Sequence, residues 1–171
     1  MRRPIRALTL VAATTAGIGT ATLAGSGLAA GSPSSAGTRV ALRANLRHCD
    51  FSPTAFAPVV PQAPLGTGTA VVHQAGSTVA VEVNLVNAAL PGMHYDVGLI
   101  QAPRSAAAPC GPGDPNTVFA GMDLDAAGRG AVTIGDAVRS GTTAVWVIVE
   151  RPSDHSQNPA EVYTSEFLVP V

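Results

Sequence analysis

The chain has 171 residues and a formal net charge of −1, with 10 basic residues, all arginine, against 11 acidic ones. Such a chain lacks the basic surface needed to bind nucleic acid or an anionic membrane. Its aromatic content of 4% also leaves too few rings for a platform that stacks nucleic-acid bases.

Residues 1–29 have the pattern of a secretory signal peptide. Three arginines precede a long uncharged run of apolar and small residues, and Gly27 and Ala29 predict cleavage before Ala30, with Ser34-Ser35-Ala36 as a second possible site. Removal of three arginines leaves seven against eleven acids, a net charge of −4. The mature chain has no apolar run long enough to span a membrane, so we expect it to be secreted or held in the cell envelope.

Residues 30–37, rich in Gly, Ser and Pro, predict a disordered mature N-terminus, and residues 38–171 a single domain. The domain begins with an alternating strand at residues 38–46. The next segment contains four prolines, and we expect a long loop there, because each proline removes a backbone hydrogen-bond donor and fixes φ. This loop contains Cys49.

Residues 66–74 and 77–86 predict two strands joined by a hairpin. Leu90-Pro91-Gly92 then turns the chain into a strand where Tyr95, Val97 and Leu99 alternate with His94, Asp96 and Gly98. The irregular segment 102–116 contains Cys110. In an exported protein, two cysteines predict one disulfide, Cys49–Cys110.

Further strands are predicted at residues 117–124, 130–138, 142–150 and 161–169, and the almost wholly apolar 142–150 belongs in the middle of a sheet. No window after the signal has a helical period. We therefore expect an all-β fold, an antiparallel Greek-key sandwich of about eight strands, immunoglobulin-like or dismutase-like.

His94 and Asp96 lie two residues apart on one strand, so their side chains share a face. They could begin a metal site, and His73 is the one other histidine on a predicted strand that could join them. The simpler interpretation, which we favour, is an exposed polar face without metal or cofactor.

Catalytic motifs are lacking. The set Ser153-Asp154-His155-Ser156 lies in one polar loop, whereas a triad draws on residues distant in sequence. A pair of catalytic carboxylates would have to come from Asp96, Glu82, Glu150, Glu161 and Glu166, and the sequence does not show which of them converge.

The proline-rich loop carries four apolar residues, Phe51, Phe56, Val59 and Val60. They either fold over the end of the sheet, which we favour, or form an exposed recognition patch.

The segments LPGMHYDVGL and DLDAAGRGAVTI, with the loop cysteine between them, resemble the copper/zinc superoxide dismutase-like sandwiches and the related CHRD-type domains. Alignment on the Pro-Gly turn puts Val97 and Leu99 at the positions of two copper-binding histidines, and His94 at a histidine that is not a ligand in that family. The resemblance therefore implies the fold without the dismutase reaction. The same layout is similar to that of exported proteins of high-GC bacteria, which implies no particular activity.

These observations favour a non-catalytic exported binding module whose two cystine-linked loops contact a protein or an envelope component. Two alternatives stay open: a metal-dependent enzyme with an altered site at His73, His94 and Asp96, and a small-ligand carrier.

Overall fold

The computed structural model describes residues 37–54 and 66–171, which belong to one compact unit, Pro33–Val171. Several predictions lie outside the described residues. They are the signal peptide at residues 1–29, most of the disordered N-terminus at residues 30–37, and the loop residues Phe56, Val59 and Val60. The described part of the chain contains strands and irregular segments and no helix, so the all-β prediction is confirmed.

Nine antiparallel strands form one sheet. Their bounds are β1 Thr38–Arg43, β2 Thr67–Ala75, β3 Thr78–Val86, β4 His94–Ala102, β5 Thr117–Asp123, β6 Arg129–Ala137, β7 Ala144–Arg151, β8 Glu161–Ser165 and β9 Val169–Pro170.

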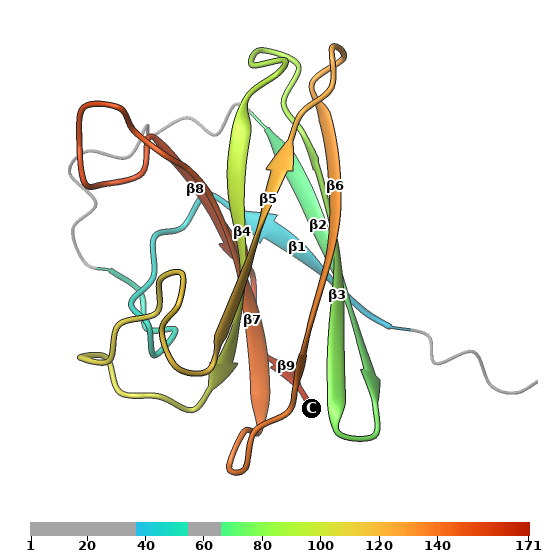
Figure 1. Cartoon of the computed structure of the whole chain (residues 1–171), viewed down its shortest axis with the longest axis vertical. Helices are drawn as coiled ribbons and strands as arrows, with labels where there is room; N and C mark the ends of the chain where they lie inside the picture. Colours follow the sequence, from blue (N-terminus) through green and yellow to red (C-terminus); the bar gives the residue numbers. More distant parts are fainter. Residues whose placement is uncertain (1–36, 55–65) are drawn as a thin grey trace, which may run out of the picture. The chain divides into compact units, whose positions relative to one another are not determined.

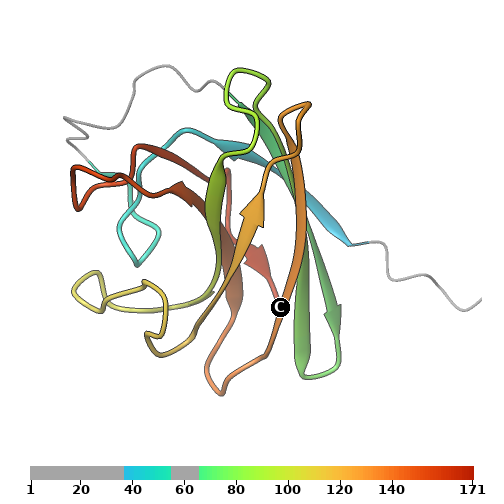
Figure 2. The same ribbon diagram turned by 45° about the horizontal axis from the view of Figure 1, so that its top comes forward.

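The strand order is β5-β4-β7-β8-β1-β2-β3-β6, and the short β9 pairs with β7. The sheet curls until its first and last strands, β5 and β6, contact each other, which makes the unit nearly barrel-shaped (Figures 1 and 2). The predicted place of the apolar segment 142–150 is correct, because β7 lies between β4 and β8.

Two predicted strands are wrong in extent. β1 ends at Arg43, and Leu46, the last residue of the predicted strand, lies beyond it and packs on the outer side of the sheet. The predicted strand 161–169 is interrupted after Ser165, and the chain bends before β9. β8 and β9 therefore pair with different parts of β7.

The inner face of the curled sheet holds the main hydrophobic core. Side chains two residues apart point the same way, so Val79, Val81, Val83 and Leu85 of β3 are all buried while Glu82 and Asn84 between them face solvent. Tyr95, Val97 and Leu99 of β4 enter the same core, as their alternation predicts.

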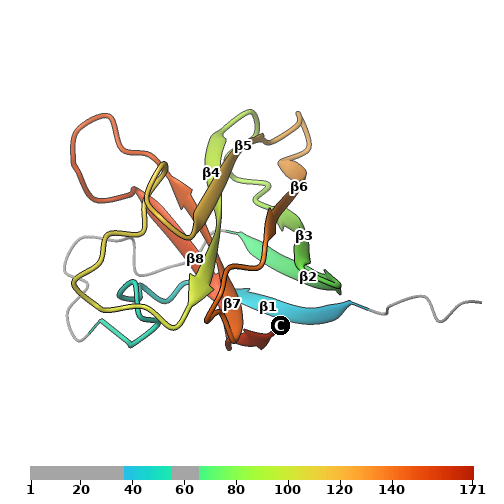
Figure 3. The same cartoon turned by 60° about the horizontal axis from the view of Figure 1, so that its bottom comes forward.

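A second, smaller core lies on the outer face of the sheet. It consists of Ile100, Trp146, Ile148 and Val162. Two loops cover it, residues 44–54 and residues 103–116, which we call the cystine lobe because the disulfide Cys49–Cys110 joins them. Figures 1 and 3 show both loops on the same side of the sheet, away from the β2–β3 hairpin.

Charged and polar groups are buried at one end of the inner core. The carboxylate of Glu161, only 3% exposed, accepts hydrogen bonds from the hydroxyls of Tyr95 and Tyr163 and from the Asn87 amide. Arg151 donates to it from the solvent side at 3.4 Å. Burial and these bonds raise the pKa of Tyr95 to about 12 and that of Tyr163 well above its usual range. A buried carboxylate is tolerated here because donors surround it.

Candidate functional site on the outer face of β4 and β7

The outer face of β4 and β7 changes character along its length. The strands pair in antiparallel register, which sets Ile100 beside Trp146, Gly98 beside Ile148 and Asp96 beside Glu150. Residues at every second position share a face, so these three pairs form one continuous strip. The strip is apolar and covered by the cystine lobe at one end, and acidic at the other.

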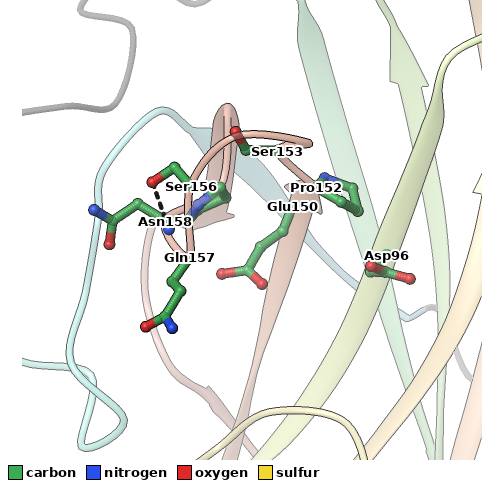
Figure 4. A pocket seen from close by; sticks show the side chains of 8 residues that line it. Asp96, Glu150, Pro152, Ser153, Ser156, Gln157 and Asn158 are labelled. Atoms are coloured by element: carbon green, nitrogen blue, oxygen red, sulfur yellow. Dashed lines mark hydrogen bonds between the residues drawn. The ribbon is translucent and has the colours of Figure 1, made fainter.

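A pocket of about 230 Å³ lies over the acidic end of the strip. Its lining residues are Asp96, Glu150, Pro152, Ser153, Ser156, Gln157, Asn158 and Pro159. The loop that follows β7 forms its wall, and in Figure 4 the Glu150 side chain lies between Gln157 of this loop and Asp96 of β4. The loop is ordered locally, since the backbone N–H of Asn158 donates to Ser156 Oγ at 3.0 Å. Every side chain of the lining except the two prolines can form hydrogen bonds with a ligand.

Glu150 is the more buried carboxylate of the pocket. Burial raises the pKa of Glu150, and the negative charge of Asp96 raises it further. The structure shows no hydrogen bond or ion pair from the Glu150 carboxylate to another described residue. A ligand group that donates hydrogen bonds or carries positive charge would offset this cost of ionisation.

His94 lies at the mouth of the same acidic region, between two aspartates. Its Nδ1 is 2.6 Å from Asp123 Oδ1, and its Nε2 is 3.5 Å from Asp96 Oδ1. The hydrogen bond with Asp123 raises the pKa of His94, and Asp96 adds to this effect. Gly121 leaves room for the ring, because a Cβ there would lie 2.6 Å from His94 Cε1. The exposed polar face predicted for His94 and Asp96 is thus a hydrogen-bonded cluster.

The structure does not bring His73 to this cluster. His73 lies on β2, four strands from β4 in the sheet order, and its Nε2 is 3.6 Å from Glu82. Among the described residues, no group of three or more His, Cys, Asp or Glu side chains is arranged to hold a metal ion.

The residues also do not fit the copper site of the dismutase-like sandwiches. Val97 and Leu99, which the resemblance would align with two ligands of that family, are completely buried in the apolar core and have no donor atom for a metal.

Phe51 is the one candidate of the predicted apolar patch that the structure describes. Its ring is half-buried, packs on Trp146 with 5.5 Å between ring centroids, and lies under the guanidinium of Arg47 at 3.9 Å. Phe51 therefore packs against the outer core and does not form an exposed recognition patch.

Sequence reasoning did not single out two groups. Glu150 was one of five candidate carboxylates, and only its register with Asp96 shows that these two converge. The polar sequence of residues 152–159 predicts a solvent-exposed loop, yet this loop forms the wall of the pocket. The signal that could have found Glu150 is its place as the first charge after a strand buried on both faces.

The sequence matches no family model, no curated protein and no solved structure. In the parts of the chain that the structure describes, no helix has the length and apolar character of a membrane span.

Proposed function

We propose that the protein is an exported, non-catalytic binding module. Its binding surface is the loop-covered face of the sheet: the cystine lobe and the neighbouring pocket of Asp96 and Glu150. The observation that carries the proposal is the register of β4 and β7, which puts two carboxylates at the open end of a strip that the lobe covers elsewhere. Loops held on a rigid sheet are a common place for binding residues.

The chemistry of the pocket indicates the kind of group that it receives. Two carboxylates, two hydroxyls and two amides line it, and Glu150 has no cationic partner among the described residues. A basic side chain or an amine of a protein or an envelope component would pair with both carboxylates. The adjacent lobe would supply the remaining contact area.

The test uses defined probes and two variants. Capped arginine and capped lysine are titrated into the labelled protein, and backbone amide shifts are followed by NMR. We expect saturable shifts at Asp96, Gly98 and Glu150, and their loss in the double variant Asp96→Asn/Glu150→Gln. Glu82→Gln, on the outer face of β3, is the matched control and should behave as the unmodified protein. Equal shifts in the double variant, or shifts spread over all acidic residues, would contradict the proposal.

Export is a separate part of the proposal, and its support is the pattern of residues 1–29. N-terminal sequencing of the protein from the medium or envelope fraction should find Ala30 as the first residue. A chain that keeps residues 1–29 and stays in the cytosol would contradict export.

We also propose that the curled sheet is a Greek-key sandwich of the dismutase-like type without its copper site. The support is the strand order: with β5 and β6 in contact, the order β3-β6-β5-β4 has the arrangement of a Greek key. An experimental structure in which β5 and β6 do not lie side by side would contradict this assignment.

A further inference from the structure

The two loops of the cystine lobe are each organised by their own hydrogen bonds. In residues 44–54, His48 N donates to Ser52 O at 2.9 Å, and Arg47 Nη1 donates to Phe51 O at 3.1 Å. Each of these bonds joins residues of the same loop. The described part of this loop can therefore keep its local structure without the second loop.

Hydrogen bonds within residues 103–116 likewise organise the second loop. Arg104 donates to the carbonyls of Pro109 and Pro115, and Gly111 N donates to Asp114 Oδ2 at 2.7 Å. Among the described residues, no hydrogen bond or ion pair runs from one loop to the other. Of the bonds between described residues, the disulfide Cys49–Cys110 is the one that joins the two loops.

The closed lobe also contains groups with unfavourable energies. Three buried donors have no hydrogen-bond acceptor among the described residues: Arg47 Nε in the first loop, Arg104 Nε in the second and Trp146 Nε1 beneath them. An unpaired buried donor costs free energy that exposure to water recovers.

Apolar contacts oppose these costs. Phe51 and Cys110 pack on the outer core of Ile100, Trp146, Ile148 and Val162. Burial of this apolar surface favours closure, while the unpaired donors favour opening. A covalent tie between the loops shifts this balance toward closure, because it limits how far the loops can separate.

We propose that Cys49–Cys110 is a redox latch, and that its reduction by a dithiol opens the cystine lobe and exposes Trp146 while the barrel stays folded. A thiolate of the dithiol attacks one sulfur and the S–S bond breaks, giving a mixed disulfide. The second thiolate then displaces the protein sulfur. The protein gains two electrons and two protons as two thiols, and the dithiol becomes a disulfide. Both cysteines are only half-buried.

Opening of the lobe does not depend on the proposed function. The protein has one tryptophan, Trp146, so its fluorescence reports on the lobe alone. The experiment reduces the full oxidised chain with dithiothreitol and counts two thiols. We expect the emission to shift to longer wavelength and the acrylamide quenching constant to rise severalfold. Far-UV circular dichroism and the amide exchange of β1, β2 and β3 should not change.

Two variants complete the test. Cys49→Ser/Cys110→Ser should have the open lobe at the start and show no response to dithiothreitol. Trp146→Phe removes one unpaired donor and keeps the apolar contact, so the amides of residues 44–54 should exchange less after its reduction than after reduction of the unmodified protein.

If two thiols are counted but the acrylamide quenching constant does not change, the latch is overturned, because the lobe then stays closed without the disulfide. Loss of the circular dichroism signal on reduction would also overturn it, because the disulfide would then hold the whole barrel. If the double serine variant does not fold, reduction of the folded unmodified chain decides between these results. None of these readouts uses a ligand, so failure of the latch is distinguishable from failure of the proposed function.

Discussion

Strands β3 and β7 belong to the same sheet but have different surroundings. β3 buries alternate side chains and exposes the others, whereas β7 is buried on both faces from Ala144 to Val149. The inner side of each strand faces the same core. The difference comes from the outer side, which is bare on β3 and covered by the cystine lobe on β7.

This comparison shows how irregular segments can make an outer strand face into a core. A sheet with one wet face predicts polar outer residues, and β3 follows this rule with Glu82 and Asn84. On β7 the outer positions are Trp146 and Ile148, and polarity returns at Glu150, where the pocket opens. The boundary between the covered and the open part of β7 is therefore where we place the binding site.

The largest expected effect comes from the buried carboxylate of Glu161, which lies opposite Arg151 at the open end of β7. Glu161→Ala leaves the hydroxyls of Tyr95 and Tyr163 and the guanidinium of Arg151 without their acceptor, and should cost about 3–5 kcal/mol in the free energy of unfolding. Urea denaturation measures this loss. Glu166→Ala, at an exposed carboxylate, is the control and should change stability by less than about 0.5 kcal/mol. Equal effects of the two substitutions would mean that the buried cluster does not form.

Substitutions on the outer faces of β7 and β3 test the difference between these two strands directly. Ile148→Ala, on the outer face of β7, should cost about 2–4 kcal/mol because it leaves a cavity under the lobe. Asn84→Ala, on the outer face of β3, should have an effect within about 0.5 kcal/mol. Thermal unfolding of both variants checks the difference. A small effect of Ile148→Ala would mean that the lobe does not bury this face in solution.

Gln101 of β4 forms hydrogen bonds with the end of β6 and the residues that follow it. Its buried amide donates to Ala137 O at 2.9 Å and accepts from Arg139 N at 2.9 Å, as the backbone of a neighbouring strand would. Gln101→Ala should cost about 1–3 kcal/mol and increase hydrogen exchange at residues 137–143. The amides of β2 serve as the internal control. Exchange that rises equally in both regions would show a global effect instead of a local one.

The smallest effect concerns the acidic end of the strip. The raised pKa of Glu150 means that the folded state binds its proton more tightly than the unfolded state. Its contribution is fully present below the unfolded pKa of 4.5 and is lost as pH rises through the folded value. Glu150→Gln should therefore raise the Tm at pH 7 by about 1–3 °C, with a smaller difference at pH 4.

The pKa of His94 is also raised, so its contribution to stability changes with pH in the same direction as that of Glu150. The two contributions must be measured separately. The raised pKa of His94 stabilises the fold below about pH 6.5, and this contribution is lost as pH rises through the folded value. Measurement of Tm against pH in Glu150→Gln and in Glu150→Gln/His94→Gln separates the two groups. A Tm of Glu150→Gln that is unchanged at pH 7 would contradict the burial of this carboxylate.

Local sequence patterns were enough to predict most strands and the side of the sheet that each residue faces. Alternation is a property of neighbouring residues, so Tyr95, Val97 and Leu99 point inward wherever β4 lies in the sheet. The break at Ser165 escaped prediction, because residues 166–168 contain no proline or glycine that would mark the bend. The site was predictable only in part: His94 and Asp96 do share a face, while His73 belongs to another part of the sheet.

The sequence by itself determined the all-β class, the alternation of the strands and the pairing of the two cysteines, because each depends on local periodicity or on counting. Only the tertiary structure decided the order of the strands, and with it which distant residues meet. Asp96 and Glu150 converge because β7 pairs with β4 in one register, and Glu161 is satisfied because β8 carries it to Tyr95 and Asn87. The physical reason is that strand pairing depends on the whole chain closing on itself, and no local pattern records that choice.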